Sequence, residues 1–383
     1  MFDPVAYVRD PHTIRARCRM LYELGLTGGL EAFHVYPEHL SRAVDYVVRE
    51  IHLNYPTLDI PYHSRWRHFE AGGVDRLASL RTTWQQLTPE EAGYQKFTLA
   101  IVSVLLDAGA GAAWQYVEPT TGVTYARSEG LAVATVHMFA RGMFDDLAAV
   151  TESLLAEGFQ VRDDNPLVGL AGRARLIQTL AGGMHPGALF ARCASRAVGK
   201  TIQATAILDE VLTNLSHIWP GRIVMHGQNL GDVWRHPAIQ TADETTQLVP
   251  FHKLSQWLTY SLMEPLEEAG YTISDVDMLT GLPEYRNGGL FLDTGVLALK
   301  DPKQFNETHD VSSHLVIEWR ALTVVLLDLV ADHVRTSLGV TAESFPLARV
   351  LQGGTWSAGR RIAAEMRPGG TPPLSIKSDG TVF

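Results

Sequence analysis

Residues 315–334 read LVIEWRALTVVLLDLVADHV, and this stretch decides the fold that the sequence predicts. Its apolar residues recur at helical spacing, and over residues 315–327 they surround almost the whole circumference of a helix. A helix of this kind lies at the centre of a core and is buried on several sides. The charged residues on it, Glu318, Arg320 and Asp328, must pair inside the protein or face a cavity, because an unpaired buried charge is costly.

A helical period also dominates the rest of the chain. Residues 96–106 form a second segment that is apolar almost all the way round. Further segments with helical spacing are residues 15–24, 37–52, 131–139, 201–218 and 251–268. Strand signals are few and short, so the sequence predicts a mainly α fold.

Residues that begin and end helices agree with this pattern. Thr88 precedes Pro89, Glu90 and Glu91, which gives an N-cap, a proline in the first turn and acidic residues there. Gly270 follows the 251–268 segment, and a glycine at this place commonly ends a helix.

The chain shows no internal repeat or low-complexity linker that divides it. We expect a single large helical catalytic domain over residues 1–366, with a possible subdivision near residues 150–190. Residues 367–383 are rich in proline and glycine and cannot continue a helix. We expect this segment to dock rather than fray, because it carries apolar residues that a free tail does not need. These residues are Leu374, Ile376, Val382 and Phe383.

The composition disfavours several classes of partner. With 46% hydrophobic residues the chain can fold, and its formal net charge of -10 works against binding to nucleic acid or an anionic membrane. A small-molecule partner is therefore expected. Cys18 and Cys193 are too few for a disulfide framework, and no export signal or membrane span is expected, so the cytoplasm fits best.

No cofactor and no metal is expected. Gly109 and Gly111 are followed by Trp114 where a dinucleotide fingerprint needs a small residue, and Gly199-Lys200-Thr201 lacks the upstream glycine of a phosphate loop. The 15 histidines include no HExxH arrangement that would align two imidazoles on zinc. They are better interpreted as surface or core residues.

The first of three segments that combine charge with aromatic residues follows residues 96–106. A buried helix reaches Asp107, opens into a glycine-rich stretch and then presents Trp114, Tyr116, Glu118 and Glu129. Glycine lets a backbone approach a ligand closely, and aromatic rings offer flat faces to a planar group. An ordinary helix end with packing aromatics would give the same pattern.

The other two segments place charged residues near an expected helix start and in an expected turn. In FHKLSQWLTYSL, Lys253 is placed to meet an anion, although lysine is more often solvated. In LTGLPEYRNGGL, residues 283–286 predict a turn that presents Glu284 and Arg286. Glu284 is either a base or the ionic neighbour of Arg286.

Longer motifs add a resemblance to a known family. The segments are LLDAGAGAAWQY, RSEGLAVA, FHKLSQWLTYSL, LTGLPEYRNGGL, IEWRALTVVLLD and SDGTVF. Together they resemble the uracil catabolism protein family of the fungal and bacterial ribosylurea pathway, over nearly the whole chain. The resemblance implies a step of pyrimidine breakdown near the ribosylurea stage, after which urea is released.

A more distant resemblance concerns three short motifs. HKLSQ, PEYR and EWRA are similar to the YKRAQ, ADYR and EIRA motifs of queuosine salvage N-glycosylases, which are helical proteins related in fold to DNA glycosylases. It implies a DNA-glycosylase-like helical architecture, with Glu284 at the position of a candidate catalytic aspartate. Beyond Asp107 the salvage proteins carry an asparagine and an aromatic residue, whereas this chain has Ala110 and Gly111, which implies a different base pocket.

These resemblances lead to the hypothesis that the protein hydrolyses the N-glycosidic bond of ribosylurea or its phosphate. Glu284 is assigned as the base or the stabiliser of an oxocarbenium-like transition state, and Lys253 as the group that holds an anion or protonates the leaving group. Asp107 is expected to fix ribose hydroxyls or accept a urea N–H, with a backbone N–H of residues 109–111 as donor. Residues expected to bind substrate or brace the site are Trp114, Tyr116, Glu129, His252, Gln256, Tyr285, Arg286, Glu318 and Arg320. For Glu318 and Arg320 a structural ion pair is an equal alternative.

Two other functions stay open at this point. An amidohydrolase or ring-opening enzyme that acts on a uracil-derived ureide would release ammonia or carbon dioxide instead of ribose. A non-catalytic scaffold would turn over no ureide and would co-purify with other enzymes of the pathway.

Overall fold

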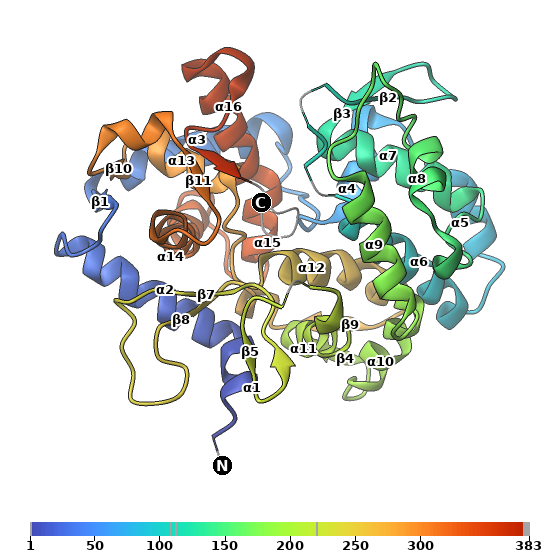
Figure 1. Ribbon diagram of the computed structural model, residues 1–383, viewed down its shortest axis with the longest axis horizontal. Coiled ribbons are helices and arrows are strands. Elements are labelled where there is room, and N and C mark those ends of the chain that lie inside the picture. The colour runs from blue at the N-terminus through green and yellow to red at the C-terminus, as the bar shows by residue number, and fades with distance from the viewer. Residues whose placement is uncertain (1, 108, 112, 220, 378–383) are drawn as a thin grey trace. The chain divides into compact units, whose positions relative to one another are not determined.

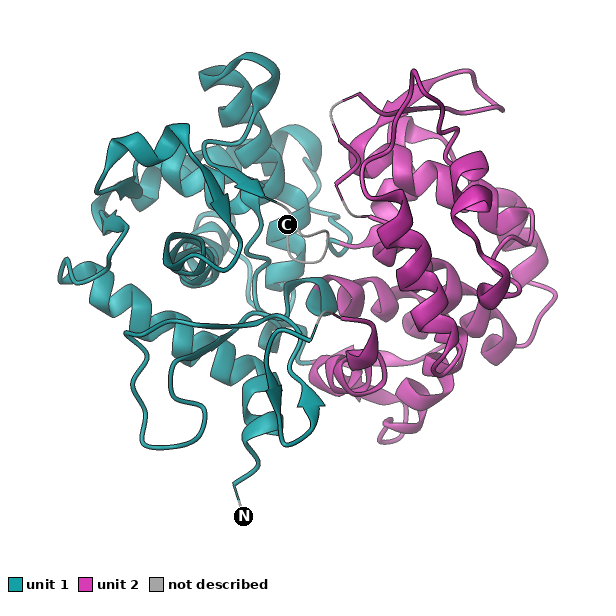
Figure 2. Ribbon diagram, viewed as in Figure 1, with its two compact units in different colours: residues 1–63, 221–256, 275–383 teal, residues 64–220, 257–274 magenta. Residues whose placement is uncertain are grey.

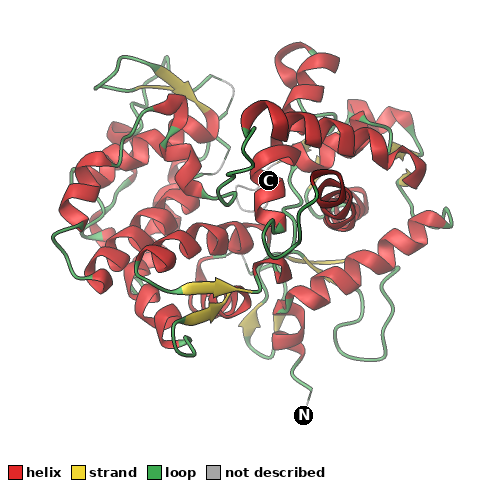
Figure 3. Ribbon diagram, turned by 180° about the vertical axis from the view of Figure 1, so that it is seen from behind, coloured by secondary structure: helices red, strands yellow, loops and turns green. Residues whose placement is uncertain are grey.

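The computed structural model describes residues 2–107, 109–111, 113–219 and 221–377. It confirms the mainly α expectation, because helices dominate and the strands are short (Figures 1 and 3). The α-helices are α1 (Pro4–Arg9), α2 (Pro11–Leu26), α3 (Leu40–Asn54), α4 (Arg65–Phe69), α5 (Ala78–Trp84), α6 (Pro89–Leu105), α7 (Arg127–Ala140), α8 (Glu152–Gly158), α9 (Leu170–Ala181), α10 (Leu189–Ser195), α11 (Ala204–Asn214), α12 (Lys253–Glu268), α13 (Tyr285–Asp293), α14 (His314–Leu338), α15 (Leu347–Val350) and α16 (Trp356–Met366).

The strands pair two by two among the described residues. The antiparallel pairs are β1 (Phe33–Val35) with β10 (Leu297–Leu299), β2 (Gln115–Val117) with β3 (Thr124–Ala126), β5 (Val224–Met225) with β6 (Gln228–Asn229), and β7 (Val233–Arg235) with β8 (Leu248–Pro250). The parallel pairs are β4 (Thr201–Gln203) with β9 (Thr272–Ser274), and β11 (Thr308–Asp310) with β12 (Ser375–Lys377).

The chain divides into two compact units (Figure 2). Unit 1 holds residues 1–63, 221–256 and 275–383, and unit 2 holds residues 64–220 and 257–274. The expectation of one catalytic domain over residues 1–366 stays a prediction.

Helix α14 is the centre of unit 1. Every residue from Leu315 to Leu327 is buried, as the apolar pattern predicts. Helices α2, α3 and α13 pack against it, and Figure 1 shows α14 nearly end-on beside α2 and α13. The Ser313 hydroxyl accepts the backbone N–H of Val316 at its start, and Gly339 ends it in the left-handed conformation, with φ +67°.

Helix α6 has the same role in unit 2. All residues over the range 97–106 are buried, and α4, α7 and α10 pack around the helix. The expected start is confirmed: Thr88 is the N-cap, its hydroxyl accepts the N–H of Glu91, and the Glu91 carboxylate accepts the N–H of Thr88. Each unit is therefore built around one helix that its sequence marks as apolar all round.

One expected helix begins later than its pattern predicts. Helical spacing covers residues 201–218, but residues 201–203 form β4 and the helix α11 starts at Ala204. Thr201 and Ile202 are β-branched, and Ile202 pairs with Ile273 of β9 in a parallel ladder. The strand partner lies far along the chain, so a local pattern cannot reveal it. The expected end of α12 is confirmed, since Gly270 has φ +88° and donates to the Glu267 carbonyl.

The described part of the C-terminal segment lies against unit 1. Arg367 donates two hydrogen bonds to Asp293, at 2.7 and 2.6 Å, and Leu374 is buried. Strand β12 then pairs with β11. Val382 and Phe383, which the docking expectation also invokes, lie outside the described residues.

The length and polarity of the helices also bear on membranes. Within the part of the chain that the structure describes, no helix combines the length and the apolar character needed to cross a bilayer.

The capping box of α6 gives a first prediction. Replacing Thr88 with alanine removes the hydroxyl that satisfies an N–H of the first turn, so the free energy of unfolding should fall by about 1 kcal/mol. Denaturant titration followed by circular dichroism measures this change. Thr82→Ala is the matched control, because Thr82 is exposed within α5 and its hydroxyl donates to the Ala78 carbonyl of the same helix. An equal loss in both variants would contradict the role of the cap.

Candidate functional site

The residues expected to form the site fall into both units. Unit 1 contains His252, Lys253, Gln256, Glu284, Tyr285, Arg286, Glu318 and Arg320, and unit 2 contains Asp107, Trp114, Tyr116 and Glu129.

Glu284 caps the N-terminus of α13 in unit 1. Its two carboxylate oxygens accept the backbone N–H groups of Arg286 and Asn287, each at 2.6 Å. Burial raises the pKa of Glu284 above its ordinary value, although these two hydrogen bonds and the positive charges of Lys253 and Arg286 act in the opposite direction. A carboxyl group that is rigidly held and has a raised proton affinity is suited to exchange a proton with a bound molecule.

The expected turn at residues 283–286 is wrong for its second half, because helix α13 begins at Tyr285. Gly288 and Gly289 suggested a loop, yet both lie inside this helix. A side chain at Gly288 would meet the indole of Trp319 at 2.7 Å, so close packing of α13 on α14 requires glycine there.

Arg320 forms a buried two-pronged ion pair with Asp232. Its Nη1 and Nη2 atoms donate to the two carboxylate oxygens at 2.8 and 2.7 Å, and its guanidinium carbon lies 4.1 Å from the centroid of the Phe251 ring. The Arg320 side chain is 1% exposed and that of Asp232 is 11% exposed. Of the two alternatives expected for Arg320, pairing inside the protein or facing a cavity, the structure shows the pair, with a partner that no sequence motif pointed to.

The same pair holds the two segments that carry Lys253 and Glu284. Asp232 also accepts the backbone N–H of Lys253, at 3.0 Å, and the indole N–H of Trp234, at 2.6 Å. Arg320 donates to the carbonyl of Pro283, at 3.4 Å. Burial raises the pKa of Asp232, but the charge of Arg320 and these hydrogen bonds outweigh it and hold the pKa far below its ordinary value.

Glu318 does not pair with Arg320, its neighbour on α14. Its two oxygens accept the backbone N–H groups of Glu31 and Ala32, at 2.7 and 2.9 Å, and it has no exposed surface. The Nε2 atom of His236 lies 3.4 Å from one of the same oxygens. These contacts fix the loop before β1.

Gln256 and His252 brace the start of α12. The Gln256 amide donates to the Thr280 hydroxyl at 2.5 Å and accepts the Thr280 N–H at 2.7 Å, which ties α12 to the segment before Glu284. His252 is buried, and its Nε2 atom lies 2.9 Å from the Val8 carbonyl.

Arg286 ties α13 to the C-terminal segment. Its Nη1 atom donates to the Gly370 carbonyl at 2.8 Å, and its guanidinium carbon lies 5.0 Å from the Tyr285 ring centroid. The side chain is buried, so Arg286 contributes to the position of Glu284 and to the charge around it.

His63 is a unit 1 residue that sequence analysis missed. Its Nδ1 atom lies 3.0 Å from Oε1 of Gln352, whose amide nitrogen donates to the Tyr55 hydroxyl at 3.1 Å. Nδ1 therefore carries the proton and Nε2 keeps its lone pair. Burial lowers the pKa of His63 to about 4, and Lys253, whose charge also acts on Glu284, adds to this effect. A single histidine outside any motif gave no sequence signal.

In unit 2, Asp107 is paired with an arginine that sequence analysis also missed. Nη1 of Arg65 lies 3.0 Å from Asp107, and the Ser128 hydroxyl lies 2.7 and 2.6 Å from the two carboxylate oxygens. Nε of Arg65 donates to the Ser103 hydroxyl at 2.8 Å. Asp107 lies two residues after the end of the central helix α6 at Leu105, and its side chain is 11% exposed.

The aromatic residues expected beside Asp107 are packed inside unit 2. Trp114 has no exposed surface, and its indole N–H donates to the Phe159 carbonyl at 2.9 Å. Tyr116 is 1% exposed. Glu129 lies in the first turn of α7, and its charge raises the pKa of Arg65, although burial lowers that pKa more strongly.

The small residues after Asp107 have a packing explanation. Ala110 is buried, and its carbonyl accepts the N–H of Val168. Gly111 has φ +85°, and a side chain there would meet Val168 at 2.7 Å. The space that a larger residue would need at position 111 is thus filled by the protein itself.

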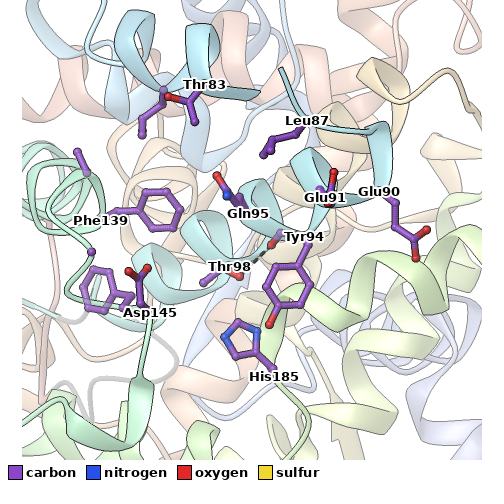
Figure 4. Close-up of a pocket in the computed structure, with 14 residues that line it drawn as sticks. Thr83, Leu87, Glu90, Glu91, Tyr94, Gln95, Thr98, Phe139, Asp145 and His185 are labelled. Atoms are coloured by element: carbon purple, nitrogen blue, oxygen red, sulfur yellow. Dashed lines mark hydrogen bonds between the residues drawn. The ribbon is translucent and has the colours of Figure 1, made fainter. Parts of the chain in front are cut away.

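Unit 2 also contains a pocket of about 730 Å³ at the start of α6 (Figure 4). Tyr94 and His185 stack along one side with ring centroids 4.7 Å apart, and Phe139 and Asp145 lie on the other side. None of the residues expected from the sequence lines this pocket. Within the described residues, no group of three or more histidine, cysteine, aspartate or glutamate side chains is placed to hold a metal ion.

The amino-acid sequence is similar to those of known proteins. Residues 7–383 match the family described as protein of unknown function (DUF1688). The chain is 38% identical over 404 residues to Protein urg3 of Schizosaccharomyces pombe, with 100% of this chain and 99% of that protein covered. It is 34% identical over 438 residues to Uracil catabolism protein 4 of Lachancea kluyveri, with 100% and 99% covered.

The buried ion pair gives a second prediction. Asp232→Asn leaves the guanidinium of Arg320 without its counter-charge, so the free energy of unfolding should fall by about 3 kcal/mol at neutral pH. Because the folded-state pKa of Asp232 is lowered, the pair should keep its full contribution above pH 3.8, the ordinary pKa, and lose it only in more acid solution.

Denaturant titration at several pH values measures both effects. Asp209→Asn is the control, since Asp209 forms a surface pair with Arg196 in which both side chains are exposed. A loss in Asp232→Asn no larger than the loss in this control would show that the buried pair does not hold unit 1 together.

Proposed function

The chain belongs to the DUF1688 family, and we propose that it acts in uracil catabolism as an N-glycoside hydrolase that cleaves ribosylurea or ribosylurea phosphate. The name of one relative, Uracil catabolism protein 4, supports the pathway. The three motifs that resemble queuosine salvage N-glycosylases support the reaction type.

The proposed reaction is supported mainly by the raised pKa of Glu284 and by the two hydrogen bonds that hold its carboxyl group in place. Hydrolysis of an N-riboside passes through an oxocarbenium-like transition state, which a nearby carboxylate stabilises. Water then forms a bond to C1′ while the C1′–N bond breaks. Glu284 accepts the proton from this water, and its raised pKa increases its strength as a base. The departing urea nitrogen keeps the electron pair of the broken bond and gains a proton.

Lys253 supplies positive charge at the start of α12. Its charge acts on Glu284 and on His63. In the proposed reaction its ammonium group holds an anionic end of the substrate or provides the proton that the urea nitrogen gains. The neutral imidazole of His63 gives this region a second acceptor close to neutral pH.

The experiment that tests the function compares four substrates. Purified protein is assayed at steady state with ribosylurea, ribosylurea phosphate, uridine and uridine monophosphate. We expect turnover of one or both ribosylurea compounds and little action on the intact nucleoside and nucleotide, because polar groups that bind urea are left unpaired by the uracil ring. Comparable rates on all four compounds would contradict the proposal.

Glu284→Gln should lose turnover by about 10²-fold or more, because the amide cannot accept the proton, and it should lose about 1 kcal/mol of stability, because its nitrogen cannot accept one of the two backbone N–H groups. Steady-state rates with ribosylurea and thermal melting of the same preparation measure the two effects. Asp301→Asn is the matched control, since Asp301 also caps a helix in unit 1 by accepting a backbone N–H. A Glu284→Gln enzyme within about twofold of the wild-type rate would remove Glu284 from the mechanism.

Lys253→Met should move the acidic limb of the pH profile of kcat/KM to higher pH. The positive charge of Lys253 lowers the pKa of Glu284, so its removal raises that pKa, and the base then loses its proton only at higher pH. Lys253→Arg keeps the charge and should keep the wild-type inflection. An unchanged inflection in Lys253→Met would show that the lysine does not set the pKa of Glu284, and a loss of thermal stability with a normal rate would assign it a purely structural role.

A further inference from the structure

Among the buried N–H donors of unit 2 that have no acceptor within the described residues are Nη2 of Arg65 and Nε1 of Trp257. The Arg65 side chain has no exposed surface, and Trp257 is 7% exposed. Leaving a buried donor unpaired costs about 1–3 kcal/mol, and native proteins rarely do so without a reason.

The two donors belong to one cluster. The guanidinium carbon of Arg65 lies 5.6 Å from the centroid of the Trp257 ring. The other nitrogens of Arg65 are engaged, Nε with Ser103 and Nη1 with Asp107 and Ser128. Only Nη2 is left to bind something from outside the chain.

An acceptor lies beside the same guanidinium. Asp107 pairs with Nη1 of Arg65, and it is the partly exposed member of this pair, with 11% of its side chain accessible. An ionised carboxylate offers about four lone-pair positions, and Arg65 and the single O–H of Ser128 occupy two of them. A ligand can therefore meet donors and an acceptor in one place.

The charge of the cluster selects the kind of ligand. Asp107 neutralises Arg65 at contact distance, and the negative charge of Glu129 also acts on Arg65. The positive charge of Arg173 also acts on Asp107, so two positive and two negative charges balance, and a phosphate or carboxylate would find no net positive charge here. A neutral group with a carbonyl oxygen and an adjacent N–H matches both the donors and the acceptor.

We propose that Arg65 and Trp257 bind the carbonyl oxygen of a ureido group and that Asp107 accepts one of its N–H groups. The inference rests on the proposed function for the choice of ureide, and its test measures binding, which does not depend on turnover. It replaces the backbone N–H of residues 109–111 with side-chain donors, since Gly111 is already packed on Val168.

The test follows the indole N–H of Trp257 by NMR in full-length protein labelled with ¹⁵N-tryptophan. N-methylurea is the probe, and Trp257→Phe assigns the signal. We expect a saturable downfield shift of the Trp257 signal, and no shift of Trp66, whose indole N–H already donates to the Ser261 carbonyl at 2.7 Å. Inorganic phosphate at the same concentrations should leave both signals in place. A Trp257 signal that ignores N-methylurea, or that responds to phosphate instead, would overturn the assignment.

Affinity for N-methylurea in the variants supplies the second arm. Trp257→Phe keeps a ring and loses one donor, so binding should weaken about fivefold to tenfold. Trp66→Phe, the matched control, should bind N-methylurea as the wild type does. Asp107→Asn should weaken binding by a similar factor, whereas Asp164→Asn, an exposed acid in the same unit, should not. If N-methylurea binds in this way but ribosylurea is not cleaved, the proposed function fails and the ureide site stands.

Discussion

The buried ion pair between Arg320 and Asp232 is the interaction on which the candidate site of unit 1 depends. A charge inside a core is tolerated only when its partner is held in good geometry, so both side chains have to be in place together. Their contacts fix the backbone of Lys253 and the carbonyl of Pro283. The segments that carry the proposed acid–base residues are thereby positioned by one pair rather than by separate loops. Arg320 lies in the stretch of α14 from Leu315 to Leu327, in which every residue is buried, and this makes the pair a rigid reference for the site.

Unit 2 also contains a buried arginine that is paired with an aspartate, but this arginine is not fully hydrogen-bonded within the described residues. Its central helix α6 ends at Leu105, two residues before Asp107, which pairs with the buried Arg65. In unit 1 the guanidinium of Arg320 is saturated by Asp232, Pro283 and the Phe251 ring. In unit 2 the guanidinium of Arg65 keeps one unpaired nitrogen beside a partly exposed carboxylate. The fully hydrogen-bonded Arg320 therefore holds the segments around it in place, whereas the N–H of Arg65 that has no acceptor among the described residues is able to bind a ligand.

The sequence predicted the elements that depend on local pattern. The buried course of α14, the capping box at Thr88 and the requirement for a partner of Arg320 all follow from periodicity and from the cost of burying charge. It could not identify that partner, because Asp232 lies 88 residues away in a loop without a motif. Nor could it show that Glu318 binds the backbone N–H groups of Glu31 and Ala32, because backbone donors have no residue signature. For a related reason, the sequence did not single out His63 or Arg65. Their partners, Gln352 and Asp107, are distant in the sequence and are brought close only by the fold.

The identity of the products tests the account most directly. Ribosylurea is incubated with the wild-type protein, and urea, free ribose and ammonia are measured against the substrate consumed. Hydrolysis of the C1′–N bond predicts equal amounts of urea and ribose and no ammonia. Release of ammonia or carbon dioxide without ribose would contradict the account, because it would show that an amide bond is cleaved and that the glycosidic bond is left intact.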